Sequence, residues 1–434
     1  MTGRELIETK LGKTEFTLMM SMTMAVVALA IDIVLPAFGD MREGFGLASD
    51  SNDIAAVITF FFFGLAAGQL LWGPLSDAFG RKKILYLGLA VYLIAAVASA
   101  LAPSLQFLFI CRFIWGIGAA GPQVVARSIV RDTYEGAAMA RAMSFIMAIF
   151  ILVPIIAPTL GSIILLAGTW RWVFGFTALF GAGIALWTLR LPETLPVERR
   201  IPFRARRLTT AARFVVTNRM AMGYTLAQMT VFGFFASYLA SSQLILDDVF
   251  GIDALFPVIF GASAAVMGVF MLMNTKLLKR FELRKLVRSV FVVYLVGGLG
   301  LAAVAYATDG TPSIFLFYAA MLPIFIGHAL LIPNLNAIAM IPMGAVAGMA
   351  AAIIGTMATL GGAVIGTFID RAFDGTITPF ATAAAISGVV AFGLMLWADA
   401  GYDKSVDKGS QIADERARKA TDLAGLAPIT GMDA

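Results

Sequence analysis

The sequence predicts an all-α membrane protein with twelve transmembrane helices in two pseudo-symmetric six-helix halves. Composition, a succession of long apolar segments and a one-sided distribution of basic residues indicate this fold class. Hydrophobic residues make up 60% of the 434 residues and charged residues only 14%, whereas a soluble domain averages about 45–50% and about 25%. So apolar a composition excludes a soluble enzyme, a disordered chain and a nucleic-acid-binding domain.

The apolar segments have the length of membrane spans, since a bilayer-crossing helix needs about 20 apolar residues. The first one carries Asp32 and Pro36, is too long for a signal peptide and lacks a small-residue cleavage site, so we expect it to remain as a span. The twelve segments are 17–38, 54–73, 83–102, 105–126, 142–166, 172–190, 220–244, 254–273, 288–307, 313–335, 346–369 and 379–398.

The basic residues fix the predicted orientation. With the N-terminus in the cytoplasm, all of the 32 lysines and arginines except Arg42, Arg112, Arg171 and Arg371 fall in cytoplasmic segments. Cytoplasmic loops of membrane proteins carry this excess of positive charge. We therefore expect both termini in the cytoplasm and a multi-pass protein of the bacterial inner membrane.

The longest internal loop divides the predicted spans six and six. We expect an N-terminal half over 1–190, a basic cytoplasmic linker over 191–219, a C-terminal half over 220–399 and a disordered cytoplasmic tail over 400–434. The loops after the second and eighth segments both carry basic clusters, about 200 residues apart, as two parallel halves of a transporter would.

Two charges lie inside predicted spans, Asp32 in the first and Arg112 in the fourth. At 1.5 Å per residue they lie roughly 9 Å and 12 Å from the same membrane surface. A lone charge at that depth costs at least ~2.5–3.5 kcal/mol. We expect them to pair in a central cavity and to couple proton binding to substrate binding, and a purely structural ion pair is the alternative.

Other candidate site residues follow from helix faces. His328 is either a second proton site or a neutral cavity residue. Further cavity candidates on the seventh segment are Gln228, Phe232, Phe235 and Tyr238.

The sequence offers little for metal or cofactor chemistry. His328 is the only histidine and Cys111 the only cysteine, so we expect no metal site, no cofactor and no enzyme activity. The G-x-G-x-x-G pattern at 116–121 lies within a predicted span with no strand before it. Close helix packing explains it better than nucleotide binding.

The loop after the second segment carries a family resemblance. Its residues Gly73, Asp77, Gly80, Arg81 and Lys82 resemble the loop motif of the major facilitator superfamily. The resemblance implies that Asp77 belongs to a gate at the cytoplasmic ends of the second and eleventh helices.

Other motifs are similar to the twelve-helix drug:proton antiporter group of this superfamily and to its Bcr/CflA-like multidrug resistance branch. Arg112 with the glycines after it resembles a helix 4 motif linked to proton coupling. Pro154, Pro158 and Gly161 resemble the helix 5 antiporter motif, and Asp32 with Pro36 resembles the helix 1 motif. The segments 191–196 and 339–348 are also similar to this group.

The resemblance implies a proton-coupled secondary transporter that exports drugs or other small amphipathic compounds by alternating access. Its partners would be the small-molecule substrate, protons and the bilayer, with no nucleic acid, and we expect a monomer. A dedicated exporter or importer of a single metabolite on the same fold remains an alternative, as does a transport-dead sensor.

Overall fold

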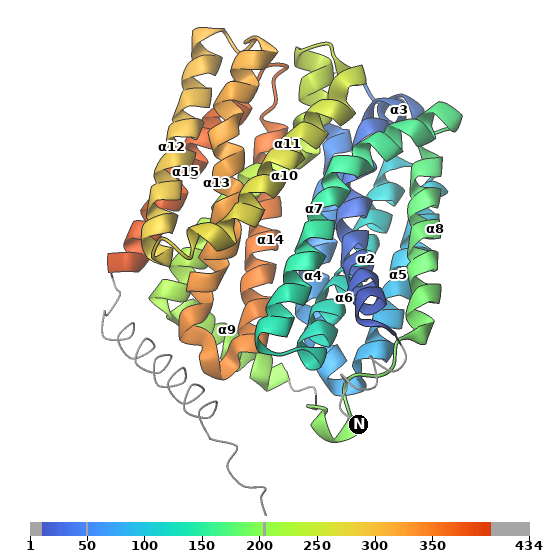
Figure 1. Cartoon of the computed structure of the whole chain (residues 1–434). Helices are drawn as coiled ribbons and strands as arrows, with labels where there is room; N and C mark the ends of the chain where they lie inside the picture. The colour runs from blue at the N-terminus through green and yellow to red at the C-terminus, as the bar shows by residue number, and fades with distance from the viewer. Residues whose placement is uncertain (1–10, 49–50, 203–204, 401–434) are drawn as a thin grey trace, which may run out of the picture.

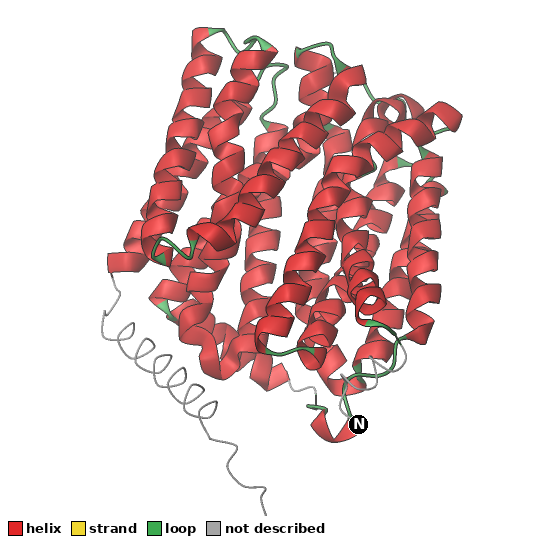
Figure 2. Cartoon of the chain, viewed as in Figure 1, coloured by secondary structure: helices red, strands yellow, loops and turns green. Residues whose placement is uncertain are grey.

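The computed structural model describes residues 11–48, 51–202 and 205–400, so nearly all of the predicted tail lies outside the described residues. Within those ranges the chain is helical and has no strand (Figure 2). Twelve of its helices are long and apolar enough to cross a membrane. The predicted fold class and number of spans are therefore confirmed.

The twelve spans are formed by consecutive helices, some of them extended by short 3-10 or π turns. In the first half they are α2 (Lys13–Asp32) with η1 (Leu35–Ala37) and α3 (Phe38–Gly44), α4 (Ala56–Phe79), α5 (Arg81–Ala100), α6 (Leu105–Thr133), α7 (Gly136–Ala167) and α8 (Arg171–Trp187). In the second half they are α10 (Arg219–Leu244) with η5 (Ile245–Val249), α11 (Phe256–Leu277), α12 (Leu283–Ala307), α13 (Ile314–Met340), α14 (Ala347–Arg371) and α15 (Thr378–Ala400).

The first six spans gather on one side of the molecule and the last six on the other (Figure 1). The two groups meet where α4 packs against α14 and where α7 packs against α11. We call the end that carries α9 and the start of α2 the linker face, at the bottom of Figure 1. The end that carries α3 is the opposite face.

The first span is longer than predicted and is interrupted. It runs over Lys13–Gly44 rather than 17–38, and α2 ends at Asp32, just before a 3-10 turn that contains Pro36. Proline has no backbone N–H and cannot continue an α-helix without losing a hydrogen bond. Asp32 therefore lies at a break in a membrane helix.

The linker also contains structure that was not predicted. Besides the short turn η4 (Val197–Arg199), the helix α9 (Ala205–Thr217) runs along the linker face and packs against α14. Ala211 and Val215 are fully buried, while Arg213 and Phe214 are exposed on its other side. This one-sided burial is typical of an amphipathic surface helix.

Glycines let the first-half helices approach closely. A Cβ at Gly64 of α4 would lie 1.9 Å from the backbone oxygen of Phe113, and one at Gly116 of α6 would lie 2.1 Å from that of Phe61. Lipid tails are as apolar as the side chains, so membrane helices associate through such close packing. The geometry supports packing, and not nucleotide binding, for the glycine pattern at 116–121.

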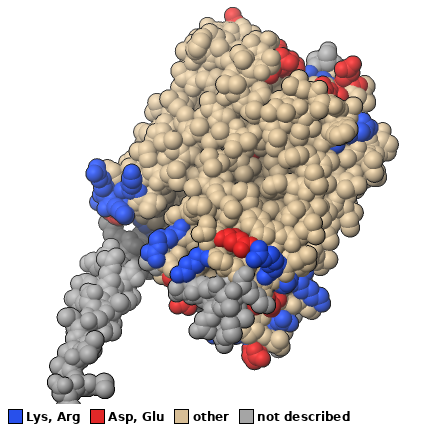
Figure 3. Space-filling model, turned by 45° about the vertical axis from the view of Figure 1, so that its right-hand side comes forward, with Lys and Arg blue, Asp and Glu red and all other residues tan. Residues whose placement is uncertain are grey.

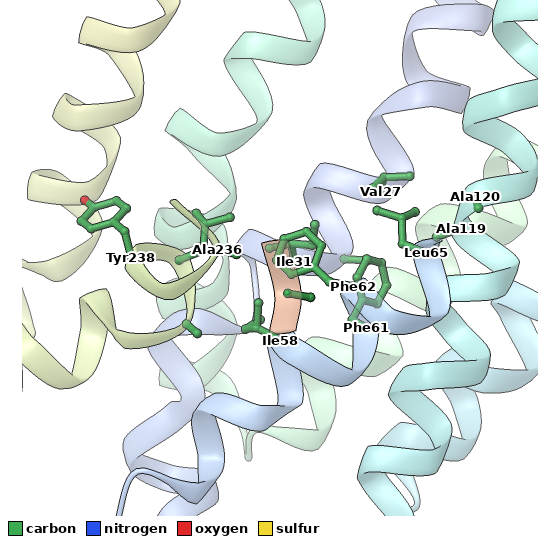
Figure 4. Packing of buried hydrophobic residues seen from close by; sticks show 14 of the residues in the cluster. Val27, Ile31, Ile58, Phe61, Phe62, Leu65, Ala119, Ala120, Ala236 and Tyr238 are labelled. Atoms are coloured by element: carbon green, nitrogen blue, oxygen red, sulfur yellow. The ribbon is translucent and has the colours of Figure 1, made fainter. Parts of the chain in front are cut away.

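Most of the buried side chains between these helices are apolar. Figure 4 shows Ile31, Phe61 and Phe62 packed between α6 and α10. On the face shown in Figure 3, a broad region of the surface has few charges, and lysines and arginines gather near the lower end. Leu166 and Phe315 are 89% and 85% exposed, as expected for side chains that face lipid.

Candidate functional site

A cavity of about 1050 Å³ lies between the two halves. Its deep end is lined by Asp32 and Tyr238, and its lining continues to Asp77, Arg131 and Ile201 at the linker face. The backbone N–H of Ile201 donates to the carbonyl of Asp77, 3.0 Å away, which fixes the linker at the mouth of the cavity. The cavity is therefore reached from the linker face.

Asp32 lies at the deep end of this cavity. It is the last residue of α2 and is only 3% exposed. Among the described residues, no group forms a hydrogen bond or an ion pair with its carboxyl group. A buried carboxyl without a protein partner is costly, so its proton occupancy depends on what enters the cavity.

Arg112 does not lie where we predicted. It is fully buried, and the cavity lining does not include it. Its Nε donates to the carbonyl of Val57 at 3.0 Å and its Nη1 to that of Ala30 at 2.9 Å. The rings of Phe61 and Trp115 lie 4.5 and 5.0 Å from its guanidinium carbon.

The predicted pair between Asp32 and Arg112 is thus absent from the described part of the chain, where no ion pair joins the two residues. The physical reason is that backbone carbonyls of α4 and α2 accept from the Nε and Nη1 atoms of Arg112, and two aromatic rings lie against its guanidinium inside the first half. Its Nη2 atom is buried and has no hydrogen-bond partner among the described residues. Arg112 binds α2 through Ala30, two residues before Asp32. Its hydrogen bonds therefore join α6 to α4 and to α2, the helix that carries the acid.

The cavity candidates of the second half all line the cavity. Gln228, Phe232, Phe235 and Tyr238 follow one another at spacings of three and four on α10, which places them on one helix face. His328 of α13 stacks on Phe235, with ring centroids 4.0 Å apart and an angle of 27° between the planes.

Sequence reasoning missed the lining contributed by α11 and α14. Phe260, Ser263 and Met267 come from α11, and a run of small residues around Gly355 comes from α14. Small and apolar residues give no polar signal within an apolar span. Gln123 of α6 also lines the cavity, and as a buried glutamine in a span it could have been found from the sequence.

The loop motif lies at the linker-face end of α4 and α5. Gly80 adopts a φ of +100°, a conformation that is strained for residues with a side chain. The glycine therefore permits the sharp turn between α4 and α5. The guanidinium of Arg81 donates to Asp132 at 2.8 Å, to Ser76 at 2.7 Å and to Asp77. Asp77 and Gly73 line the mouth of the cavity, as do residues of the α14 start across from them.

Glu193 caps the start of α5 and joins the linker to this motif. Its carboxylate accepts hydrogen bonds from the backbone N–H groups of Arg81 at 3.0 Å and Lys82 at 3.2 Å. The Lys82 ammonium in turn donates to the carbonyl of Leu189, 3.0 Å away. A carboxylate is favoured at a helix N-terminus because the helix dipole is positive there.

The antiporter-like motif allows α7 to pack against both α2 and α11. The helix continues through Pro154 and Pro158, and Pro154 lines the cavity. A Cβ at Gly161 would lie 2.3 Å from the carbonyl oxygen of Ile33, the residue after Asp32. On the other side, a Cβ at Gly261 of α11 would lie 3.0 Å from the carbonyl oxygen of Ile155.

The opposite face is closed by contacts between the halves. Arg42 of α3 forms a bidentate ion pair with Asp248 of η5, both N–O distances being 3.1 Å. A second contact between the halves is the hydrogen bond that Asn52 donates to the backbone carbonyl of Asp370 at 2.6 Å. The structure therefore represents one state of access, open to the linker face.

Comparison with known proteins agrees with this architecture. The sequence profile of the Major Facilitator Superfamily matches residues 20–366. The chain is 24% identical to the bicyclomycin resistance protein homolog of Haemophilus influenzae, covering 85% of this chain and 93% of that protein. It is 25% identical to multidrug resistance protein D of Escherichia coli, covering 80% and 86%.

The fold also matches a solved transporter. The xylose transporter XylE from E. coli, in a partially occluded inward-open conformation, superposes with a TM-score of 0.71 at 14% identity, covering 88% of this chain and 96% of that one. At this identity the likeness shows the fold alone. Because the family profile spans most of the chain and the twelve-helix fold agrees with it, this protein belongs to the Major Facilitator Superfamily.

Proposed function

We propose that this transporter exports drugs or other small amphipathic compounds in exchange for protons, with its linker face in the cytoplasm. The observation that carries the proposal is the position of Asp32. It is a buried carboxyl with no hydrogen-bond or ion-pair partner among the described residues, at the deep end of a large and mainly apolar cavity. The names of the relatives from H. influenzae and E. coli support drug resistance as the biological outcome.

The exchange follows from competition at this carboxyl. In the state described, Asp32 is reached from the linker face, where a compound that enters the cavity can displace its proton. When the opposite face opens and the linker face closes, the compound leaves and a proton from the more acidic side binds Asp32. Charge in the cavity stays low at each step when the compound is a cation, because the cation and the proton alternate at the Asp32 carboxylate.

The basic linker supports the orientation. Arginines crowd the linker face, including those of α9 and of the loop motif, and cytoplasmic loops carry this excess. A cavity open to this face would collect compounds from the cytoplasm.

Reconstituted protein tests the coupling. In proteoliposomes with an imposed pH gradient, Asp32→Asn should abolish uphill movement of ethidium while leaving the protein folded and inserted. Asp40→Asn is the matched control, since it removes the same charge from an exposed site on α3 and should leave transport intact. If Asp32→Asn still moved ethidium uphill, proton exchange at Asp32 would be rejected.

Substrate breadth needs a second measurement. Expression in an efflux-deficient bacterial host should lower susceptibility to several amphipathic antibiotics and dyes. If no compound of a broad panel shifted, export or import of a single metabolite on the same fold would replace the multidrug proposal. A protein that transported nothing in either assay would instead be a sensor.

A further inference from the structure

Two arginines of α6 line the cavity in the part that opens to the linker face. Gln123, Arg127 and Arg131 all line it, and their spacing of four residues places them on one face of the helix. Arg127 and Arg131 are exposed, although both belong to the lining of an interior cavity. A compound that enters the cavity can therefore reach both guanidinium groups.

These two guanidinium groups are not compensated by the protein. Neither has a hydrogen-bond or ion-pair partner among the described residues. The acids of the lining do not compensate them, because Asp77 is bound by Arg81 and Asp32 lies at the deep end of the cavity. Charged residues within a membrane span are costly and typically mark the path of a substrate. The two arginines therefore place positive charge on the route into the cavity.

The arginine pair and Asp32 lie at different depths. Arg112 donates to the carbonyl of Ala30, so this part of α6 lies close to the depth of Asp32. Arg127 lies about four turns further along α6, which is roughly 22 Å nearer the linker face. A compound that enters from the linker face consequently meets the arginines first and Asp32 later.

We infer that Arg127 and Arg131 form an entry site for the carboxylate of amphipathic zwitterions. A guanidinium group recognises a carboxylate because it donates two parallel hydrogen bonds to the two oxygens. The inference rests on the proposed transport function and specifies its substrate class. The carboxylate of the compound binds the arginines at the cavity mouth, and its cationic group reaches Asp32 only after the compound has moved deeper.

Two rhodamine dyes isolate the contribution of the carboxylate. Tetramethylrhodamine carries a carboxylate on a cationic, planar ring system and is a zwitterion. Its methyl ester has the same rings and the same cation, but the carboxylate is masked. Binding of each dye to the purified full-length protein in a neutral detergent is measured by fluorescence polarisation, independently of transport. The readout is the ratio of the two dissociation constants, and partitioning of the dyes into detergent affects this ratio equally in every variant.

Wild-type protein should prefer the zwitterion, and Arg127→Gln or Arg131→Gln should each shift the ratio about tenfold towards the ester. Arg127→Lys keeps the charge but loses the planar pair of donors, so its shift should be smaller. Arg213→Gln is the matched control, since it removes an exposed arginine of the linker face that does not line the cavity, and it should leave the ratio unchanged. Retained binding of the ester shows that each variant is folded.

An anionic lipid headgroup is a second source of a group that arginines bind, and a competition experiment separates the two sources. Phosphatidylglycerol added to the micelles should leave the affinity of wild-type protein for the zwitterion unchanged. If the lipid displaced the dye from wild-type protein, the arginines would hold a headgroup and the inference would be wrong.

The inference would also be overturned if both glutamine variants left the ratio unchanged, if Arg213→Gln produced the same shift, or if wild-type protein bound neither dye. The proposed antiport fails separately. If Arg127→Gln shifts the ratio but wild-type protein moves no dye against a pH gradient, the carboxylate site stands and the antiport is rejected.

Discussion

Arg42 and Asp248 join the two halves of the transporter at the opposite face through a bidentate ion pair. Arg42 is 6% exposed, and both of its terminal nitrogens lie 3.1 Å from a carboxylate oxygen. Arg42 comes from the end of the first span and Asp248 from the π turn after α10. The pair therefore stabilises the state in which the cavity opens only to the linker face.

Breaking this pair should favour opening of the opposite face. Removing one partner of a buried, hydrogen-bonded charge pair costs about 2–5 kcal/mol, so Arg42→Gln should raise the open population at least about tenfold. The measurement is labelling of Ala264→Cys, which lines the cavity, by an impermeant thiol reagent added at the opposite face. Cys111→Ala provides the background, because Cys111 is the only native cysteine.

Two further variants test the assignment of that effect. Arg371→Gln removes an exposed arginine near the same face and should not change the labelling rate. Exchanging the charges with Arg42→Asp and Asp248→Arg should restore protection at least in part. Labelling that stayed slow in Arg42→Gln would show that the pair does not hold the face closed.

The positions of Asp32 and Arg112 show how far the sequence could reach. Composition and the positions of basic residues predicted the spans, because a charge in lipid is costly wherever it lies in the chain. The same cost led us to pair the two charges. Sequence alone could not show that Arg112 donates to the carbonyls of Val57 and Ala30, since these contacts depend on how three helices pack.

The cavity wall on α10 was predictable for a different reason. Gln228, Phe232, Phe235 and Tyr238 repeat at helical spacing, so a single helix face brings them together. The part of the cavity wall formed by α14 was not predictable, because its small residues line a cavity only through the way the other helices pack around them. Helix α9 was overlooked because its many arginines concealed the periodic apolar residues Ala211 and Val215.

The absence of an ion pair between Asp32 and Arg112 can be measured by a double-mutant cycle. Arg112→Lys should destabilise the protein by about 2 kcal/mol, because an ammonium group cannot donate in the planar geometry that reaches both carbonyls. If the two residues are independent, the effects of Asp32→Asn and Arg112→Lys on the free energy of unfolding should be additive, with a coupling energy under about 0.5 kcal/mol. Unfolding of the purified variants in SDS gives these free energies. A coupling energy several times larger would show that Asp32 and Arg112 interact as the sequence predicted.

Gly161 sets how closely α7 approaches the helix break at Asp32. Its Cβ would lie 2.3 Å from the carbonyl oxygen of Ile33, so Gly161→Ala must push the two helices apart. Overpacking of this kind costs about 1–3 kcal/mol, and we expect both stability and transport to fall. Gly183→Ala on α8 is the control, since nothing lies within 4 Å of its Cβ position. Equal effects of the two substitutions in SDS unfolding would exclude close packing as the reason.

Glu193 should stabilise the loop motif through its charge at the start of α5. Its carboxylate accepts from the backbone N–H groups of Arg81 and Lys82 on α5, and from those of Thr194 and Leu195 in the linker. Glu193→Gln keeps the size of the side chain and one acceptor oxygen but loses the charge, so we expect a loss of about 1 kcal/mol.

Glu193→Ala also removes the acceptors and should cost about 2 kcal/mol. The exposed Glu198 lies in the same linker, and Glu198→Ala should change stability by no more than about 0.5 kcal/mol. Because the bonds from Arg81 and Lys82 join the linker to the first half, limited proteolysis of the linker should also accelerate in Glu193→Ala. If Glu193→Ala and Glu198→Ala proved equally stable and equally resistant to protease, the linker would be held at the cavity mouth by its other contacts, such as the hydrogen bond between Ile201 and Asp77.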